Sequence, residues 1–146
     1  MPLKFPHSFA VPCIAFFLCL CGCHSHSSSP SPERRTISPG NEIEIIDSYF
    51  NTSITSSVSV VFRNTKKVDL PSFYMDYSIS CDNSYKKYDS DYLTFSSDQQ
   101  LTGSYYTGGD ATSCTFTITA IRPLFDTSSY DNWLGSYPIV IQKAEP

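Results

Sequence analysis

The chain has 146 residues, and its formal net charge at pH 7 is −4. This length suits a single domain. The acidic balance argues against a nucleic-acid partner, which needs a basic surface, and against electrostatic docking on anionic lipid head groups.

The N-terminus carries an apolar run over residues 9–20, with Lys4 as the only charged residue before it. This length suits the hydrophobic region of a signal peptide and is short of the roughly 20 apolar residues of a membrane-spanning helix. The run ends in Leu20-Cys21-Gly22-Cys23, which resembles the lipobox of bacterial lipoproteins. In that family the cysteine after the glycine is lipidated and becomes the mature N-terminus.

The resemblance implies a signal peptide over residues 1–22 and attachment to the lipid bilayer through acyl chains on Cys23. Stable anchoring needs two or more chains, which a diacylglyceryl-modified, N-acylated cysteine supplies. His24, rather than Asp, follows Cys23. By the sorting pattern of enteric bacteria this favours the outer membrane over the inner membrane. The sequence leaves both the periplasmic and the outer face of that membrane as alternatives. An ordinary secretory signal, cleaved near Gly22 or His24, is the alternative.

Residues 23–40 are rich in serine and proline and contain one large aliphatic residue, Ile37. Such a segment buries too little apolar surface to offset the entropy of ordering it, so we expect a flexible tether. His24 and His26 lie in it without a third ligand, and we predict no metal site there. The folded domain is expected over residues 41–146. Without residues 1–22 the formal charge is −5.

From residue 41 onward, apolar and polar residues alternate with a period of two, which is typical of half-buried strands. The alternation is strongest over residues 54–62, 73–81 and 114–120, and weaker over residues 42–50, 92–96, 101–106 and 138–142. Turn residues separate these segments at 64–67, 70–72, 82–84 and 108–110. The pattern predicts an all-β fold, a single antiparallel immunoglobulin-like sandwich of about seven strands. Residues 124–137 fit either a long loop or a further strand pair.

Two cysteines, Cys81 and Cys114, lie outside the N-terminal region. An exported chain meets an oxidising compartment, so we expect a disulfide between them. Both are in phase with the apolar residues of their strands, which places the bridge near the core. It joins either two sheets or two neighbouring strands. Closing a loop of this size is worth roughly 3–4 kcal/mol in the chain-entropy picture.

A series of short motifs between residues 58 and 123 is similar to bacterial immunoglobulin-like repeats of the ASPM/SPD-2/Hydin and choice-of-anchor types. The motifs are Val60-Val61-Phe62-Arg63-Asn64-Thr65, Pro71-Ser72-Phe73, Cys81, Ser113-Cys114-Thr115-Phe116-Thr117-Ile118-Thr119 and Pro123. In these repeats glycines usually precede the second cysteine, and Gly108-Gly109 matches that pattern only loosely. The resemblance implies an immunoglobulin-like sandwich that serves as a binding or spacer module on a cell envelope. A fold-level analogy assigns no activity.

Groups needed for catalysis are missing from the expected domain. No histidine follows His26, so a serine or cysteine nucleophile has no histidine base and a His/Cys zinc site has no ligands. No phosphate-binding loop follows Gly108-Gly109. The segment 82–92 lacks the spacing of a calcium loop. The carboxylates considered are Asp76, Asp82, Asp89, Asp91 and Asp98. Their spacing in the sequence gives no reason to expect any two of them in one cleft. We therefore predict a non-catalytic protein without metal or cofactor.

Aromatic residues offer a binding surface, because tyrosine and tryptophan are enriched at interaction patches. The candidates are Tyr105, Tyr106, Tyr130 and Trp133. For Trp133, as for Tyr77, a position in the core is favoured, whereas Tyr105, Tyr106 and Tyr130 fit either a surface or a core position. We therefore predict a membrane-anchored envelope lipoprotein that acts as a protein-binding or accessory module. The alternative is a surface adhesin or carbohydrate-binding module that uses tyrosine and tryptophan platforms.

Overall fold

The computed structural model describes residues 35–51, 56–124 and 130–144, and these contain strands and turns without a helix. The strands, in chain order, are β1 (Arg35–Thr36), β2 (Ile43–Asn51), β3 (Ser57–Asn64), β4 (Leu70–Cys81), β5 (Lys86–Phe95), β6 (Gln100–Tyr106), β7 (Ser113–Pro123), β8 (Tyr130–Asp131) and β9 (Trp133–Gln142). Seven of them are long. The described residues contain no helix long and apolar enough to cross a membrane.

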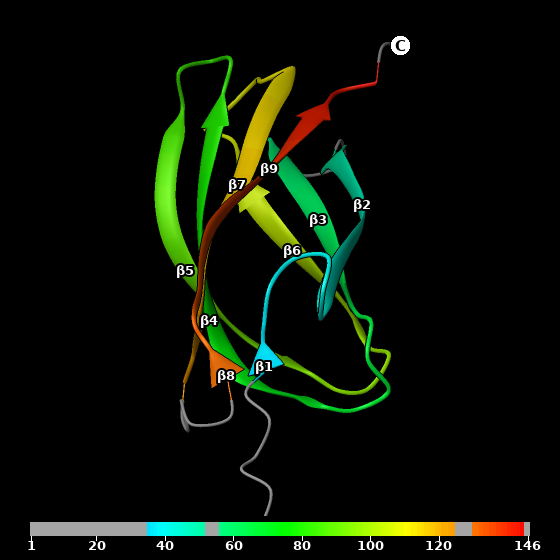
Figure 1. Cartoon of the computed structure of the whole chain (residues 1–146). Helices are drawn as coiled ribbons and strands as arrows, with labels where there is room; N and C mark the ends of the chain where they lie inside the picture. The colour runs from blue at the N-terminus through cyan, green and yellow to red at the C-terminus, as the bar shows by residue number, and fades with distance from the viewer. Residues whose placement is uncertain (1–34, 52–55, 125–129, 145–146) are drawn as a thin grey trace, which may run out of the picture.

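The seven long strands form two antiparallel sheets that pack face to face (Figure 1). One sheet has the order β2-β3-β6 and the other the order β5-β4-β7-β9, while β1 and β8 form a short parallel pair. The prediction of an all-β antiparallel sandwich is confirmed. The chain crosses between sheets after β3, β5 and β6. In the four-stranded sheet β5 pairs with β4 and forms one end of the sheet. An additional strand takes the same position in variable-type immunoglobulin domains.

The core lies between the inner faces of the two sheets. Val58, Val60 and Phe62 of β3 face the other sheet, where Phe73 on β4 and Phe116 on β7 are also fully buried. The Phe62 and Phe116 rings approach to 6.4 Å between centroids. Burial of each such side chain contributes about 1.5–3 kcal/mol. The period-two alternation in the sequence thus marks the inward faces of these three strands.

The predicted disulfide between Cys81 and Cys114 is present. The two residues lie directly opposite each other on the neighbouring strands β4 and β7. Of the two arrangements left open by the sequence, the bridge therefore joins neighbouring strands of one sheet. It differs from the bridge of antibody domains, which connects the two sheets.

The folded part of the chain already includes residues 35–40, which corrects the expected boundary at residue 41. Ile37 is completely buried in the core cluster and Ser38 is 4% exposed. Arg35 and Thr36 pair with β8. The segment thus contributes one core side chain, Ile37, although its composition is polar. Residues 1–34, which include the lipobox, Cys23, His24 and His26, lie outside the described residues.

Two local predictions are also wrong. Residues 70–72 do not form a turn but begin β4, with a shift of register against β5 between Leu70 and Phe73. Such an irregularity admits a proline into a strand. β5 begins at Lys86 rather than near residue 92. Its first nine residues are all at least partly exposed, so the polar stretch lacked the alternation that identifies a half-buried strand.

Candidate binding surfaces

The four aromatic residues proposed as a binding surface do not gather on one face. Tyr105 is only 5% exposed, and its ring lies 4.6 Å from Phe116 and 4.8 Å from Tyr77 between centroids. It pairs with the inward-facing Val58, so its side chain enters the core. Tyr105 is therefore a core residue and not part of a binding surface, whereas the core position considered for Tyr77 is confirmed.

The other three candidates lie at opposite ends of the sandwich. Tyr106 is 55% exposed, and its ring contacts Tyr85 at the end that carries the β4–β5 turn. Tyr130 and Trp133 are partly buried against the core. They belong to β8 and the start of β9, at the end where β1 lies (Figure 1). Tyr106 cannot share a small ligand with them.

Three other tyrosines lie with polar residues on the outer face of the four-stranded sheet. We call this group the tyrosine face; its members are Tyr74, Asp76, Tyr88, Ser90, Tyr92 and Arg122. The register places its members together, because Tyr74 pairs with both Tyr92 and Arg122, and Asp76 pairs with Ser90. Tyr88 is 78% exposed and Tyr92 is 54% exposed.

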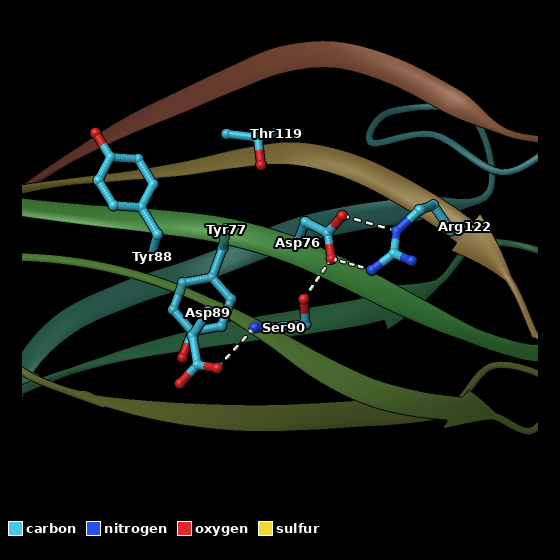
Figure 2. Close-up of a pocket in the computed structure, with 7 residues that line it drawn as sticks. All are labelled: Asp76, Tyr77, Tyr88, Asp89, Ser90, Thr119 and Arg122. Atoms are coloured by element: carbon cyan, nitrogen blue, oxygen red, sulfur yellow. Dashed lines mark hydrogen bonds and ion pairs between the residues drawn. The ribbon is translucent and has the colours of Figure 1, made fainter.

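An ion pair lies at the centre of the tyrosine face (Figure 2). Arg122 donates from Nε to Oδ2 of Asp76 at 2.8 Å and from Nη2 to Oδ1 at 2.6 Å, and Ser90 donates its hydroxyl proton to the same carboxylate. The guanidinium also lies 5.5 Å from the centroid of the Tyr74 ring. The contact with Arg122 lowers the pKa of Asp76 below its ordinary value, so the carboxylate is charged at neutral pH. The pair carries no net charge.

The tyrosine face contains an open hollow of about 350 Å³. Its lining includes Asp76, Tyr88, Ser90, Thr119 and Arg122, which come from three neighbouring strands (Figure 2). The hollow therefore offers an aromatic ring, two hydroxyl groups and a paired carboxylate and guanidinium to a ligand.

A second surface lies where β2 and β9 form the same lateral side of the sandwich. These strands end their respective sheets and are not paired with each other. Between them is a groove of about 400 Å³, which we call the β2/β9 edge, lined by Ile45, Ile46, Asp47, Ser48, Tyr137, Ile139 and Val140. Ile46 is 37% and Val140 is 63% exposed. A shift of register between Ile45 and Asp47 turns Ile46 outward.

Of the carboxylates considered in the sequence, Asp82 and Asp89, like Asp76, have local structural partners. Asp82 accepts hydrogen bonds from the backbone and the hydroxyl of Thr112, and Asp89 forms an ion pair of 2.6 Å with Lys87. Within the described ranges, no three His, Cys, Asp or Glu side chains gather in a way that could hold a metal ion. Asp82 therefore fixes a turn, and the Asp89–Lys87 pair lies within β5.

No protein-family model, curated protein or solved structure matches this chain. Its surfaces therefore have to be interpreted from their own chemistry. One signal for the tyrosine face was present in the sequence, because Tyr74 and Asp76 alternate with the apolar residues of their strand and must point outward. The contribution of Tyr88, Ser90 and Tyr92 required the register of β5 against β4.

Proposed function

We propose that this chain is a membrane-anchored, non-catalytic binding module of the bacterial envelope. Acyl chains on Cys23 hold it at the outer membrane, and an envelope protein contacts it at the β2/β9 edge. The observation that carries the proposal is the groove at this edge, where the apolar side chains of Ile46 and Val140 are exposed beside an end strand, β9, that has no charged residue. Soluble domains seldom expose such apolar groups together unless they bind a partner.

The free side of β9 suits a partner that adds a strand. Within the described part of the chain β9 pairs only with β7, so its other side presents backbone N–H and C=O groups. Because Pro138 supplies no N–H, we take Ile139–Gln142 as the stretch that pairs with the added strand. Alternate side chains of an added strand would enter the groove beside Ile45 and Ile139. β5, by contrast, carries Lys86, Lys87, Asp89 and Asp91, charges of the kind that protect an edge from pairing.

The contact can be tested by capture from detergent-solubilised membranes with the full-length, lipidated protein. Ile46→Lys and Val140→Lys place a charge at exposed positions, so the fold is retained while strand addition and apolar contact are blocked. We expect one reproducible partner with the wild-type protein and its loss with either variant. Tyr88→Ala, on the other side of the sandwich, is the control that keeps the partner. Absence of a reproducible partner, or equal capture by both charged variants, would overturn the proposed contact.

The anchor is tested separately, by the intact mass of the protein recovered from membranes. We expect the mass of residues 23–146 plus a diacylglycerol and an acyl chain, and a gain of two hydrogens on reduction of the Cys81–Cys114 bridge. A mass without lipid would contradict the anchor. It would favour a secreted adhesin or carbohydrate-binding module, the alternative for which the tyrosine face is the supporting observation.

A further inference from the structure

The tyrosine face presents two exposed aromatic rings on one strand. Tyr88 and Tyr92 are four residues apart on the same side of β5, which separates them by about 13 Å along the strand. The hydroxyls of Ser72 and Thr94, which bond to each other at 2.9 Å, lie by Tyr92 and lower its pKa.

Aromatic rings exposed in this way suit a ligand with flat C–H faces. A tyrosine ring can stack on the apolar face of a sugar ring while its hydroxyl remains in water. Because the two rings are about 13 Å apart, a monosaccharide cannot contact both, whereas a short oligosaccharide laid along β5 can.

The groups between the two rings suit hydroxyls. Asp76 lies opposite Ser90 and accepts two hydrogen bonds from Arg122 and one from the Ser90 hydroxyl, which leaves about one acceptor site. A guanidinium has five N–H donors, of which this contact uses two, and a carboxylate has about four acceptor sites. Donors and acceptors therefore lie side by side, which matches two neighbouring hydroxyl groups on a sugar ring. The side chains of Asp76 and Arg122 are 26% and 46% exposed, so both remain accessible.

The two charges at the centre of this face neutralise each other, because Asp76 is paired with Arg122. Lys87 and Asp89 pair with each other on the opposite side of β5, and the exposed Lys86 lies beyond Tyr88 at one end of the face. The exposed Thr119 adds a hydroxyl to the hollow. Because the carboxylate and the guanidinium in the hollow neutralise each other, the hollow gives no advantage to an anionic or cationic ligand, and its hydroxyls and ion pair disfavour a purely apolar one.

The size of the face also favours a small ligand over a protein. Three strands about 4.8 Å apart and five residues of β5 make a patch of about 10 Å by 13 Å. A standard protein interface covers roughly 800 Å² on each partner, several times this area.

We infer that the tyrosine face is a carbohydrate-binding site for a neutral oligosaccharide that stacks on Tyr88 and Tyr92 and places hydroxyls on Asp76, Ser90 and Arg122. This site is separate from the β2/β9 edge and does not depend on the protein contact proposed there. Stacking sets the affinity, and the ion pair selects neighbouring hydroxyls of the correct geometry.

Titration calorimetry with the full-length protein, in a detergent without a sugar head group, tests the inference. The probes are neutral hexasaccharides of glucose and of N-acetylglucosamine, with glucose as the monosaccharide and hexagalacturonate as an anionic comparison. We expect at least one neutral hexasaccharide to bind more tightly than the monosaccharide and the anionic chain. Tyr88→Ala and Tyr92→Ala should each weaken binding by about tenfold, the size of one lost aromatic contact. Tyr106→Ala removes a tyrosine of the other sheet that is as exposed as Tyr92, and it should not change binding.

Several outcomes would overturn the inference: no neutral oligosaccharide binds at millimolar concentration, hexagalacturonate binds best, or Tyr106→Ala weakens binding as much as Tyr88→Ala. Loss of a captured protein partner in Tyr88→Ala would also overturn it, because the face would then be a protein contact. Ile46→Lys and Val140→Lys should leave sugar binding intact. Failure of the edge proposal and failure of the carbohydrate site are therefore distinguishable.

Discussion

Gly103 and Tyr105 lie on the same side of β6, and a Cβ added at Gly103 would stand 2.7 Å from Cζ of the Tyr105 ring. The ring therefore occupies the space that a side chain at position 103 would need. Since Tyr105 is packed between Tyr77 and Phe116, it cannot move aside freely.

We predict that Gly103→Ala destabilises the fold by about 1–3 kcal/mol through overpacking. The same change in a Tyr105→Ala background should cost much less, because the colliding ring is gone. Urea unfolding of the four proteins in this cycle measures the coupling. A neutral Gly103→Ala in the wild-type background would show that the Tyr105 ring does not hold this position.

The Cys81–Cys114 bridge closes a loop with a sequence separation of 33 residues. Replacing both cysteines with alanine should lower the free energy of unfolding by about 3–4 kcal/mol, because the unfolded chain gains loop entropy. Urea unfolding with and without reductant measures this difference. Reductant should destabilise the wild-type protein and leave the double variant unchanged. Equal midpoints for the oxidised and reduced wild-type protein would contradict the prediction.

Asp76 gives the tyrosine face a pH dependence. Its pKa is lowered from 3.8 in the folded protein, chiefly by the hydrogen bonds from Arg122, so folding favours the charged carboxylate. The stabilisation is complete above the unfolded pKa and is lost as the pH falls from 3.8 through the folded pKa. Because the pair is partly exposed, it is worth less than about 1 kcal/mol.

The measurement is the difference in unfolding free energy between the wild-type protein and Asp76→Asn as a function of pH. We expect the difference to be constant near neutral pH and to shrink below about pH 4. Arg122→Gln should produce a similar loss at neutral pH. A difference that grows on acidification would have the wrong sign and would contradict the assignment.

Ile37 tests where the domain begins. It is completely buried, whereas the neighbouring Thr36 is exposed. Ile37→Ala should lower stability by about 2–5 kcal/mol, the usual cost of a core truncation. Thr36→Ala should stay within about 0.5 kcal/mol of the wild type. If thermal unfolding finds both variants equally stable, residues 35–40 are not part of the fold.

The strands that could be predicted are those with one face buried. β3, β4 and β7 alternate because Val58, Phe73 and Phe116 face the core while their neighbours face water or a sheet surface. The first part of β5, residues 86–91, escaped prediction because β5 is an end strand and its Tyr88 and Asp89 are both exposed. Apolar and polar residues alternate along a strand only where one of its two sides is buried.

The candidate site depended on information that is not local. Tyr105 and Tyr106 are neighbours of the same type, and only the pairing of Tyr105 with Val58 decides which of them enters the core. The tyrosine face likewise needs the pairing of Asp76 with Ser90 across two strands. Register depends on the whole sandwich, so spacing along the chain could identify the aromatic residues but not their grouping.

The most direct test of the account is photo-cross-linking in intact cells, with a photoreactive residue at Val140 of the full-length protein. We predict one adduct of defined size to an envelope protein from position 140, its loss when Ile46→Lys is added, and no such adduct from position 88 on the tyrosine face. Equal adducts from both positions, or none from position 140, would contradict the proposal that an envelope protein docks at the β2/β9 edge.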